Sequence, residues 1–457
     1  MSGNTRPHGI PGKDAPSPGE RFPLAAKALR VSTAQASQRH DDVQPSTPRA
    51  ATTQAARSKA NNWPLYLMLV LLPLQNIQYG YIPNIGGGLN FLNVMPALSL
   101  LGALILKGKL APRDPIRKWL VAYVLYTIVS LLIGNLVVGL AAERFIILKD
   151  HLVGILLYFL VQMSVRNWSH VRRIFICTLI PLPYIARVTI NQHLSVSSWH
   201  YSDDLRITGT FSQLGANEFA AFCVTVSIVL LAVLLATRLN RWWKIALIGG
   251  IVCMLIGILY SYSRTAYIAL LLGILTVILV WRGRWKLIPL VVAIALLAPA
   301  WLPPSVVERF DSTTVAEGQR DESTELRIVY WGVAWDIFKG HPLTGTGFQT
   351  FKILNPYGKD THNLYMRTLA EGGILGAIML VGLLLSLLAT ARKTVSRSPS
   401  GTWVYGLSLG MLGATLALIC SNLFGDRFTY YPVAAYFWTY AALMVKSPLL
   451  PPEEGGT

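Results

Sequence analysis

Long apolar runs separated by short polar segments dominate the chain from residue 63 onwards. A helix needs about 20 apolar residues to cross the hydrocarbon of a bilayer. The candidate spans lie near residues 63–79, 90–106, 119–140, 145–165, 173–190, 214–237, 243–261, 265–281, 285–301, 373–391, 402–421 and 429–446. The pattern predicts an all-α polytopic membrane protein with about twelve transmembrane helices.

Two of these spans carry features that interrupt a regular helix. The span near 173–190 contains Pro181 and Pro183, and proline kinks a helix because it lacks a donor N–H and its ring clashes with the preceding turn. The span near 265–281 follows the previous one after only a short polar turn at residues 261–264. We therefore expect a kink in the first span and a tight reversal before the second.

The basic residues are distributed unevenly between the two sides of the predicted topology. With an even number of spans, both termini lie on one side. That side carries 27 basic and 7 acidic residues, whereas the rest of the chain carries 13 and 15. Lysine and arginine concentrate in the cytoplasmic loops of bacterial inner-membrane proteins. The asymmetry predicts cytoplasmic termini, and it accounts for the net charge of +18 without nucleic acid as a partner.

Composition supports the membrane interpretation and argues against a metal site. Only 14% of the residues are charged, against about 25% in a soluble domain. All cysteines fall inside apolar runs, where they act as small hydrophobes: Cys177, Cys223, Cys253 and Cys420. Histidines and carboxylates do not cluster at ligand spacing, so we expect no metal and no cofactor.

Two outer segments are longer than simple connections. Residues 302–372 separate the ninth and tenth spans, and residues 191–213 separate the fifth and sixth; loops this long are usually functional or disordered. Among the aromatic side chains of the longer loop are Trp331, Trp335, Phe338, Phe348 and Phe351. We therefore expect it to fold in part, with an amphipathic helix over 324–339 lying along the membrane face.

These features divide the chain into five predicted regions. The first 60 residues are polar and lack a periodic apolar face, which predicts disorder. Because the first apolar run begins so late, we expect an uncleaved anchor. The regions are a basic cytoplasmic tail (1–60), transmembrane helices one to nine (61–301), a periplasmic loop (302–372), helices ten to twelve (373–446) and a cytoplasmic tail (447–457).

Arginines near the outer ends of the spans are candidates for binding an anion. Arg264 lies between two apolar runs, where a guanidinium is costly unless it reaches water or an anion. Arg206 and Arg327 lie in the two outer loops. Because guanidinium groups form bidentate contacts with phosphate oxygens, their convergence would suit a diphosphate. Each alone can equally be a topology anchor or a surface ion pair, and Arg187 can either line the same cavity or snorkel.

His362 closes the long loop just before the tenth predicted span. An imidazole accepts a proton near neutral pH, so His362 is a candidate general base, although a single loop histidine often has no such role. Glycines that permit tight turns flank it: Gly345, Gly347, Gly373 and Gly376. Glu371 lies at the predicted start of the tenth span, where it either caps the helix or orients a catalytic group.

Four short segments occur in a fixed order on the predicted outer face. They are Arg206-Ile-Thr-Gly-Thr-Phe with Asn217 and Phe219 after it, Ser263-Arg264-Thr265-Ala266, Arg327 to Trp331 followed by His341-Pro-Leu-Thr-Gly-Thr-Gly347, and His362-Asn363 followed by Gly373-Ile-Leu-Gly376. In content, order and spacing these segments resemble the O-antigen ligase and O-antigen polymerase superfamily over roughly residues 200–380.

That resemblance implies transfer of a glycan from a polyprenyl diphosphate, usually undecaprenyl diphosphate, to an acceptor hydroxyl at the periplasmic face. His362 would be the base that activates the acceptor. Arg264 and Arg206 would hold the diphosphate and stabilise its charge on leaving. The reaction would be metal-independent and would invert the anomeric carbon. The remaining residues assigned to substrate binding are Arg327, Asn363, Glu371 and Arg187.

Several functions stay open at this point. The acceptor can be lipid A core, another lipid-linked repeat, or a protein hydroxyl as in a protein O-oligosaccharyltransferase; the lack of a large extra outer domain favours the first two. A lipid-linked glycan flippase or secondary transporter can also have twelve spans. Transporters favour ionisable residues at the midplane and internal repeats, however, and these spans are almost free of charge. A structural subunit of an assembly complex is a third class.

Overall fold

The computed structural model describes residues 61–82, 90–196, 205–212, 214–286 and 322–451. Throughout these ranges the regular elements are helices, so the all-α prediction is confirmed there. The tail predicted over 1–60 lies outside the described residues, as do most of the tail predicted over 447–457 and most of the span predicted near 285–301.

The first half of the chain forms helices that correspond to the first five predicted spans. They are α3 (Trp63–Leu71), α4 (Gln75–Gly80), α5 (Phe91–Ile105), α6 (Pro115–Val138), α7 (Ala142–Ser164), α8 (Trp168–Leu179) and α9 (Leu182–Ser195). The first span is interrupted by Pro73, which separates α3 from α4. The fifth is interrupted at Pro181, between α8 and α9, which confirms the predicted kink.

The second half adds the remaining helices. They are α10 (Ala216–Ala236), α11 (Arg241–Tyr260), α12 (Arg264–Val280), α15 (Glu322–Gly340), α16 (Phe351–Leu354), α17 (Leu364–Arg397), α18 (Trp403–Ser421) and α19 (Tyr431–Lys446), with short 3-10 turns η2 (Arg284–Lys286), η3 (Asn422–Phe424) and η4 (Ser447–Leu449). The expected reversal of the chain at residues 261–264 is present between α11 and α12. Helix α15 contains the predicted amphipathic helix over 324–339.

Among the described residues, seven segments are long and apolar enough to cross a membrane. They are α6, α7, the α8–α9 pair, α10, α11, α17, and α18 with η3. Helices α5 and α12 are apolar but shorter. The chain is therefore a multi-pass membrane protein by length and composition, and the total of twelve spans remains a prediction.

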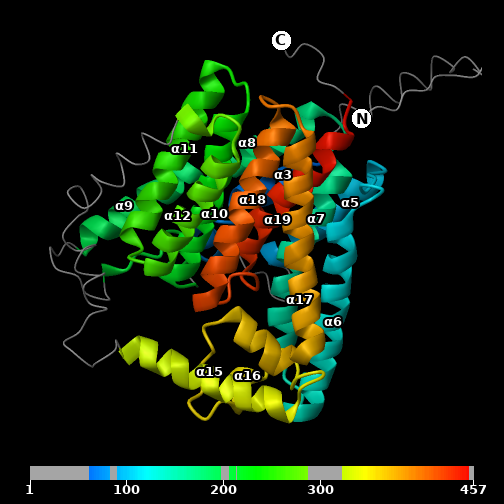
Figure 1. Ribbon diagram of the computed structural model, residues 1–457, viewed down its shortest axis with the longest axis vertical. Coiled ribbons are helices and arrows are strands. Elements are labelled where there is room, and N and C mark those ends of the chain that lie inside the picture. Colours follow the sequence, from blue (N-terminus) through cyan, green and yellow to red (C-terminus); the bar gives the residue numbers. More distant parts are fainter. Residues whose placement is uncertain (1–60, 83–89, 197–204, 213, 287–321, 452–457) are drawn as a thin grey trace, which may run out of the picture. The chain divides into compact units, whose positions relative to one another are not determined.

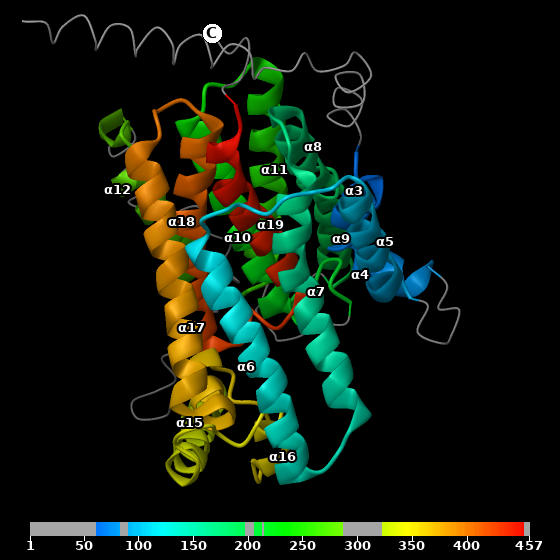
Figure 2. The same ribbon diagram turned by 90° about the vertical axis from the view of Figure 1, so that its right-hand side faces the viewer.

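Helix α10 lies at the centre of the helical assembly. It packs against α18, α11, α12 and α19, and α19 in turn packs against α7 (Figures 1 and 2). Close approach to α18 depends on Gly410 and Gly413, where an added methyl group would meet Val229 of α10 and Gly273 of α12. Small residues bring membrane helices close together in this way because packing drives their association.

The loops that carry the basic residues meet at one end of the assembly. Lys446 donates to the carbonyl of Lys109 at 2.6 Å, and Arg282 donates to the carbonyl of Ser398 at 3.0 Å. At the starts of α11 and α18, the rings of Trp243 and Trp403 pack at 5.0 Å. Because these loops lie together, their basic residues can form a single basic face.

Candidate functional site

At the opposite ends of these helices, the structure joins two of the segments that stood out in the sequence. Arg206 donates to the side-chain oxygen of Asn217 at 2.6 Å, and the Ser263 hydroxyl donates to the same oxygen at 2.8 Å. Asn217 is in the first turn of α10, and Ser263 immediately precedes Arg264, the first residue of α12. Arg206 and Ser263, the residue before Arg264, therefore meet where two helices present their N-termini, an environment that favours anions.

The turn that carries His362 is held by its neighbours. Asn363 caps α17, since its side-chain oxygen accepts from the N–H groups of Tyr365 at 2.9 Å and Met366 at 3.1 Å. Trp331 of α15 donates its indole N–H to the carbonyl of Thr361 at 3.0 Å. His362 itself has a φ of 50°, in the left-handed region that few non-glycine residues adopt. The histidine is thus fixed in a strained turn from both sides.

The surroundings of His362 favour its neutral form. Its side chain reaches solvent, yet partial desolvation by the surrounding protein lowers the pKa. Arg327 and Arg427 lower the pKa further, whereas Asp360 and Glu218 act in the opposite direction. An imidazole that is neutral at pH 7 can accept a proton, so the site provides a base that solvent can reach.

Helix α17 is broken just after this turn, at Gly373. This residue has φ 57° and ψ −160°, which divides α17 into a short arm (residues 364–372) and a longer helix that begins at the predicted start of the tenth span. A break in a membrane helix frees backbone groups that must find other partners. The segment 341–348, called here the glycine loop, provides them.

The glycine loop binds on both sides of the break. The N–H groups of Ile374 and Leu375 donate to the carbonyls of Pro342 and Leu343 at 2.8 and 3.2 Å. In the other direction, Thr346 and Gly347 donate to the carbonyls of Ala370 and Glu371 at 3.0 and 2.8 Å. The break is thereby satisfied by the loop rather than by water, and the loop is fixed against α17.

Glycine is required where this loop meets its neighbours. Gly345 (φ 66°) and Gly347 (φ 106°) lie in the left-handed region, and a side chain would strike the backbone of Glu371 at the first position and of Gly134 in α6 at the second. Phe348 continues the contact by donating its N–H to the carbonyl of Ser130 at 3.0 Å. The glycines flanking His362 therefore allow α6, the glycine loop and α17 to pack backbone against backbone.

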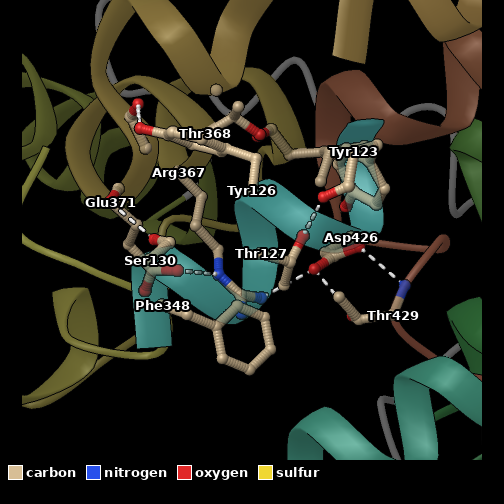
Figure 3. A pocket seen from close by; sticks show the side chains of 13 residues that line it. Tyr123, Tyr126, Thr127, Ser130, Phe348, Arg367, Thr368, Glu371, Asp426 and Thr429 are labelled. Carbon is tan, nitrogen blue, oxygen red and sulfur yellow. Dashed lines mark hydrogen bonds and ion pairs between the residues drawn. The ribbon is translucent and has the colours of Figure 1, made fainter. Parts of the chain in front are cut away.

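Beneath the His362 turn lies a buried ionic network. Arg367 donates to Glu371 at 3.2 Å and to Asp426 at 2.6 Å (Figure 3). Asp360 lies 3.7 Å from Arg367. Arg367, Glu371 and Asp426 border a cavity of about 50 Å³ together with Tyr123, Thr127 and other side chains of α6. Buried charges of this kind are tolerated only when they are paired and hydrogen-bonded, and the network meets that condition.

The structure assigns contacts to the other predicted site residues. Glu371 does not cap its own helix, because α17 begins at Leu364 and not at the predicted position. Its carboxylate instead accepts from the N–H groups of Gln349 and Phe351, both at 3.0 Å. Arg327 is half-buried on α15 and acts electrostatically on His362. Arg187 is exposed on α9.

Several charged residues at the site were missed in the sequence. A charge in or beside an apolar run is the signal that could have found them, because such groups need partners in a membrane. They are Glu218, Asp360, Arg367, Asp426 and Arg427. In the described ranges, no group of three or more His, Cys, Asp or Glu side chains could hold a metal ion.

Part of the chain that carries this site is similar to a known protein family. Residues 249–381 match the family model described as O-antigen ligase. The match begins in α11 and includes Arg264, Arg327, the glycine loop, His362 and the break in α17. A comparison with curated proteins finds no match. Over this segment, which is less than half of the chain, the protein is similar to the O-antigen ligase family.

Proposed function

We propose that the protein transfers a glycan from undecaprenyl diphosphate to an acceptor hydroxyl, as an O-antigen ligase or a polysaccharide polymerase. The observation that carries the proposal is the arrangement of a solvent-accessible histidine, whose pKa is lowered by its surroundings, and two half-buried arginines at the same end of the helices. The family match supports the class of reaction. The basic loops at the opposite end support a bacterial inner-membrane location with a periplasmic site.

The reaction follows from the chemistry of these groups. A sugar hydroxyl is a poor nucleophile, so His362 removes its proton as the hydroxyl oxygen attacks the anomeric carbon. The bond from that carbon to the diphosphate oxygen breaks, and the lipid diphosphate leaves with the bonding electrons. Arg206 and Arg264 stabilise the charge that develops on the diphosphate. A single displacement of this kind inverts the anomeric carbon and uses no metal ion or cofactor in our proposal.

The remaining site residues support this chemistry in different ways. Arg327 is positioned on α15 to contribute a further positive charge near His362. Asn363 and Glu371 use their side-chain oxygens in capping and in backbone contacts, so we assign them to holding the site rather than to binding substrate. Arg187 is left outside the proposed site.

A genetic experiment tests the proposal. We expect deletion of the gene in its host to remove long-chain surface glycan, and the wild-type gene to restore it. The variants His362→Ala and Arg264→Ala should fail to complement, whereas Arg187→Ala, an arginine exposed on α9, should complement. Immunoblots of the membrane fraction show whether each variant is present at the wild-type level.

The glycan profile identifies the acceptor. Single repeats still attached to lipid A core in the deletion strain indicate a polymerase, whereas free lipid-linked polymer with bare core indicates a ligase. Full complementation by both His362→Ala and Arg264→Ala at wild-type protein levels would refute the assignment of the site.

A further inference from the structure

The connection between α18 and α19 is a compact turn with two adjacent residues of opposite charge. Asp426 accepts from the N–H and the hydroxyl of Thr429 at 3.2 and 2.7 Å. The N–H of Arg427 donates to the side-chain oxygen of Asn422 at 2.7 Å. We call residues 422–429 the Asp426–Arg427 turn. The hydrogen bonds within this turn hold the Asp426 carboxylate and the Arg427 backbone in place.

The side chains of Asp426 and Arg427 form ion pairs with residues of two different helices. Asp426 accepts from Arg367 in the short arm of α17, with the two side chains 4% and 8% exposed. Arg427 forms an ion pair with Glu218 at the start of α10, with side chains 4% and 13% exposed. A surface ion pair contributes little to structure, but buried partners hold a defined geometry because each would otherwise be an uncompensated charge. The turn therefore links α17 to α10.

Each of these helices carries one half of the proposed site. In α17, the N–H of Leu364 donates to the carbonyl of Gly425 at 3.0 Å, so the turn contacts the residue two positions after His362. In α10, Glu218 follows Asn217, whose side chain holds both Arg206 and Ser263. The linkage thus runs from the base, through the turn, to the residues that would hold the diphosphate.

We propose that Asp426 and Arg427 are positioning residues that set the distance between His362 and the diphosphate-binding arginines. This inference rests on the proposed function for its chemical consequence, because the base must lie within reach of the acceptor oxygen while the arginines hold the leaving group. The coupling itself is a property of the described contacts. Arg427 and Glu218 also have opposite electrostatic effects on the pKa of His362.

Because these two effects are opposite, the coupling can be tested through the pKa of His362, without a measurement of enzyme activity. The charged groups that act on His362 are Asp360 on its own loop, Arg327 on α15, Arg427 on the turn and Glu218 on α10. Since Arg427 lowers the pKa of His362 and Glu218 raises it, Arg427→Gln should raise this pKa and Glu218→Gln should lower it. The double variant should lie between the two single variants.

The experiment is a histidine titration by NMR on the purified full chain in lipid nanodiscs, with isotope-labelled histidine. The His362 signal is assigned by its loss in His362→Gln. Lys339→Gln serves as a matched control, because it breaks an ion pair with Asp336 whose side chains are 60% and 71% exposed. We expect opposite pKa shifts for the Arg427 and Glu218 variants and none for the control. Shifts in the same direction, or no shift in either variant, would overturn the coupling.

Activity measurements test the consequence for catalysis. We expect Arg427→Gln to lower kcat tenfold or more while the KM for the lipid-linked donor changes less than threefold, because the binding groups remain and their relation to the base is lost. The charge exchange Glu218→Arg with Arg427→Glu should recover more kcat than either single change. A KM increase with unchanged kcat would overturn the positioning role.

The two measurements separate failure of this inference from failure of the proposed function. Opposite pKa shifts in the two variants, found together with a wild-type protein that transfers no glycan, would sustain the coupling and refute the function. Glycan transfer by wild type, with no response of His362 to either charge, would sustain the function and refute the coupling. Thermal unfolding of each variant distinguishes loss of positioning from loss of folding: a variant that keeps the wild-type midpoint yet loses kcat supports positioning, and one whose kcat loss follows its unfolding contradicts it.

Discussion

Replacing Gly373 with alanine tests whether the break in α17 builds the site. Gly373 has φ 57° and ψ −160°, a region essentially restricted to glycine because a Cβ atom clashes there. A Cβ would also lie 2.5 Å from the carbonyl carbon and oxygen of Leu343 and 2.6 Å from the nitrogen of Gly345. These are backbone atoms, which cannot rotate away as a side chain would, so the glycine loop must move.

The magnitude follows from strain and from the hydrogen bonds at risk. Holding a non-glycine residue in such a conformation costs on the order of 1–3 kcal/mol. Moving the loop also threatens the four backbone hydrogen bonds that bridge the break, each worth about 1 kcal/mol. We therefore expect Gly373→Ala to destabilise the protein by roughly 3–6 kcal/mol, with loss of glycan transfer because the arm before the break carries the His362 turn.

The assay compares this variant with a matched glycine substitution in purified protein. Gly332, in α15, has no heavy atom within 4 Å of an added Cβ, and glycine to alanine inside a helix stabilises by about 0.5–1 kcal/mol. Thermal unfolding in one detergent, followed by transfer activity in liposomes, should show a large loss for Gly373→Ala and none for Gly332→Ala. A Gly373→Ala protein with wild-type unfolding and activity would refute the role of the break.

Two further predictions concern charges at the site. Glu371→Gln should destabilise the protein by about 3–5 kcal/mol, because it removes one carboxylate from the buried network around Arg367 and leaves that charge less compensated; chemical unfolding checks this, and a change below 1 kcal/mol would contradict it. Transfer activity should fall as the pH drops through the pKa of His362, because protonation removes the base. Since desolvation and Arg327 lower that pKa, the midpoint should lie below 6.5, the usual histidine value, and Arg327→Gln should move it upward. A midpoint at or above 6.5 in wild type, or a downward movement in the variant, would contradict this assignment.

Much of the helical organisation could be predicted from the sequence, because apolar runs of spanning length have few alternatives in a membrane. The kink at Pro181 and the helix in the long loop were also predictable from local residue types. The arm of α17 before Gly373 was not, since Arg367 and Glu371 interrupt its apolar pattern and end the predicted span at the break. A hydropathy pattern indicates where an apolar run begins, whereas the helix itself extends further towards the N-terminus, to its cap at Asn363.

The candidate site shows the same division. The sequence singled out Arg206, Arg264, Arg327 and His362 by their setting and by the order of their motifs. It could not show that Asn217 joins two of those motifs.

By itself, the sequence indicated a multi-pass membrane protein, and it predicted that the basic residues lie on one face and which short segments carry the chemistry. Those properties are local or additive, so composition and order are sufficient. Only the tertiary structure decided which buried charges are partners. Arg427 lies 209 positions from Glu218 and Arg367 lies 59 positions from Asp426. Pairing at such separations depends on how the helices pack, and no periodicity along the chain indicates it.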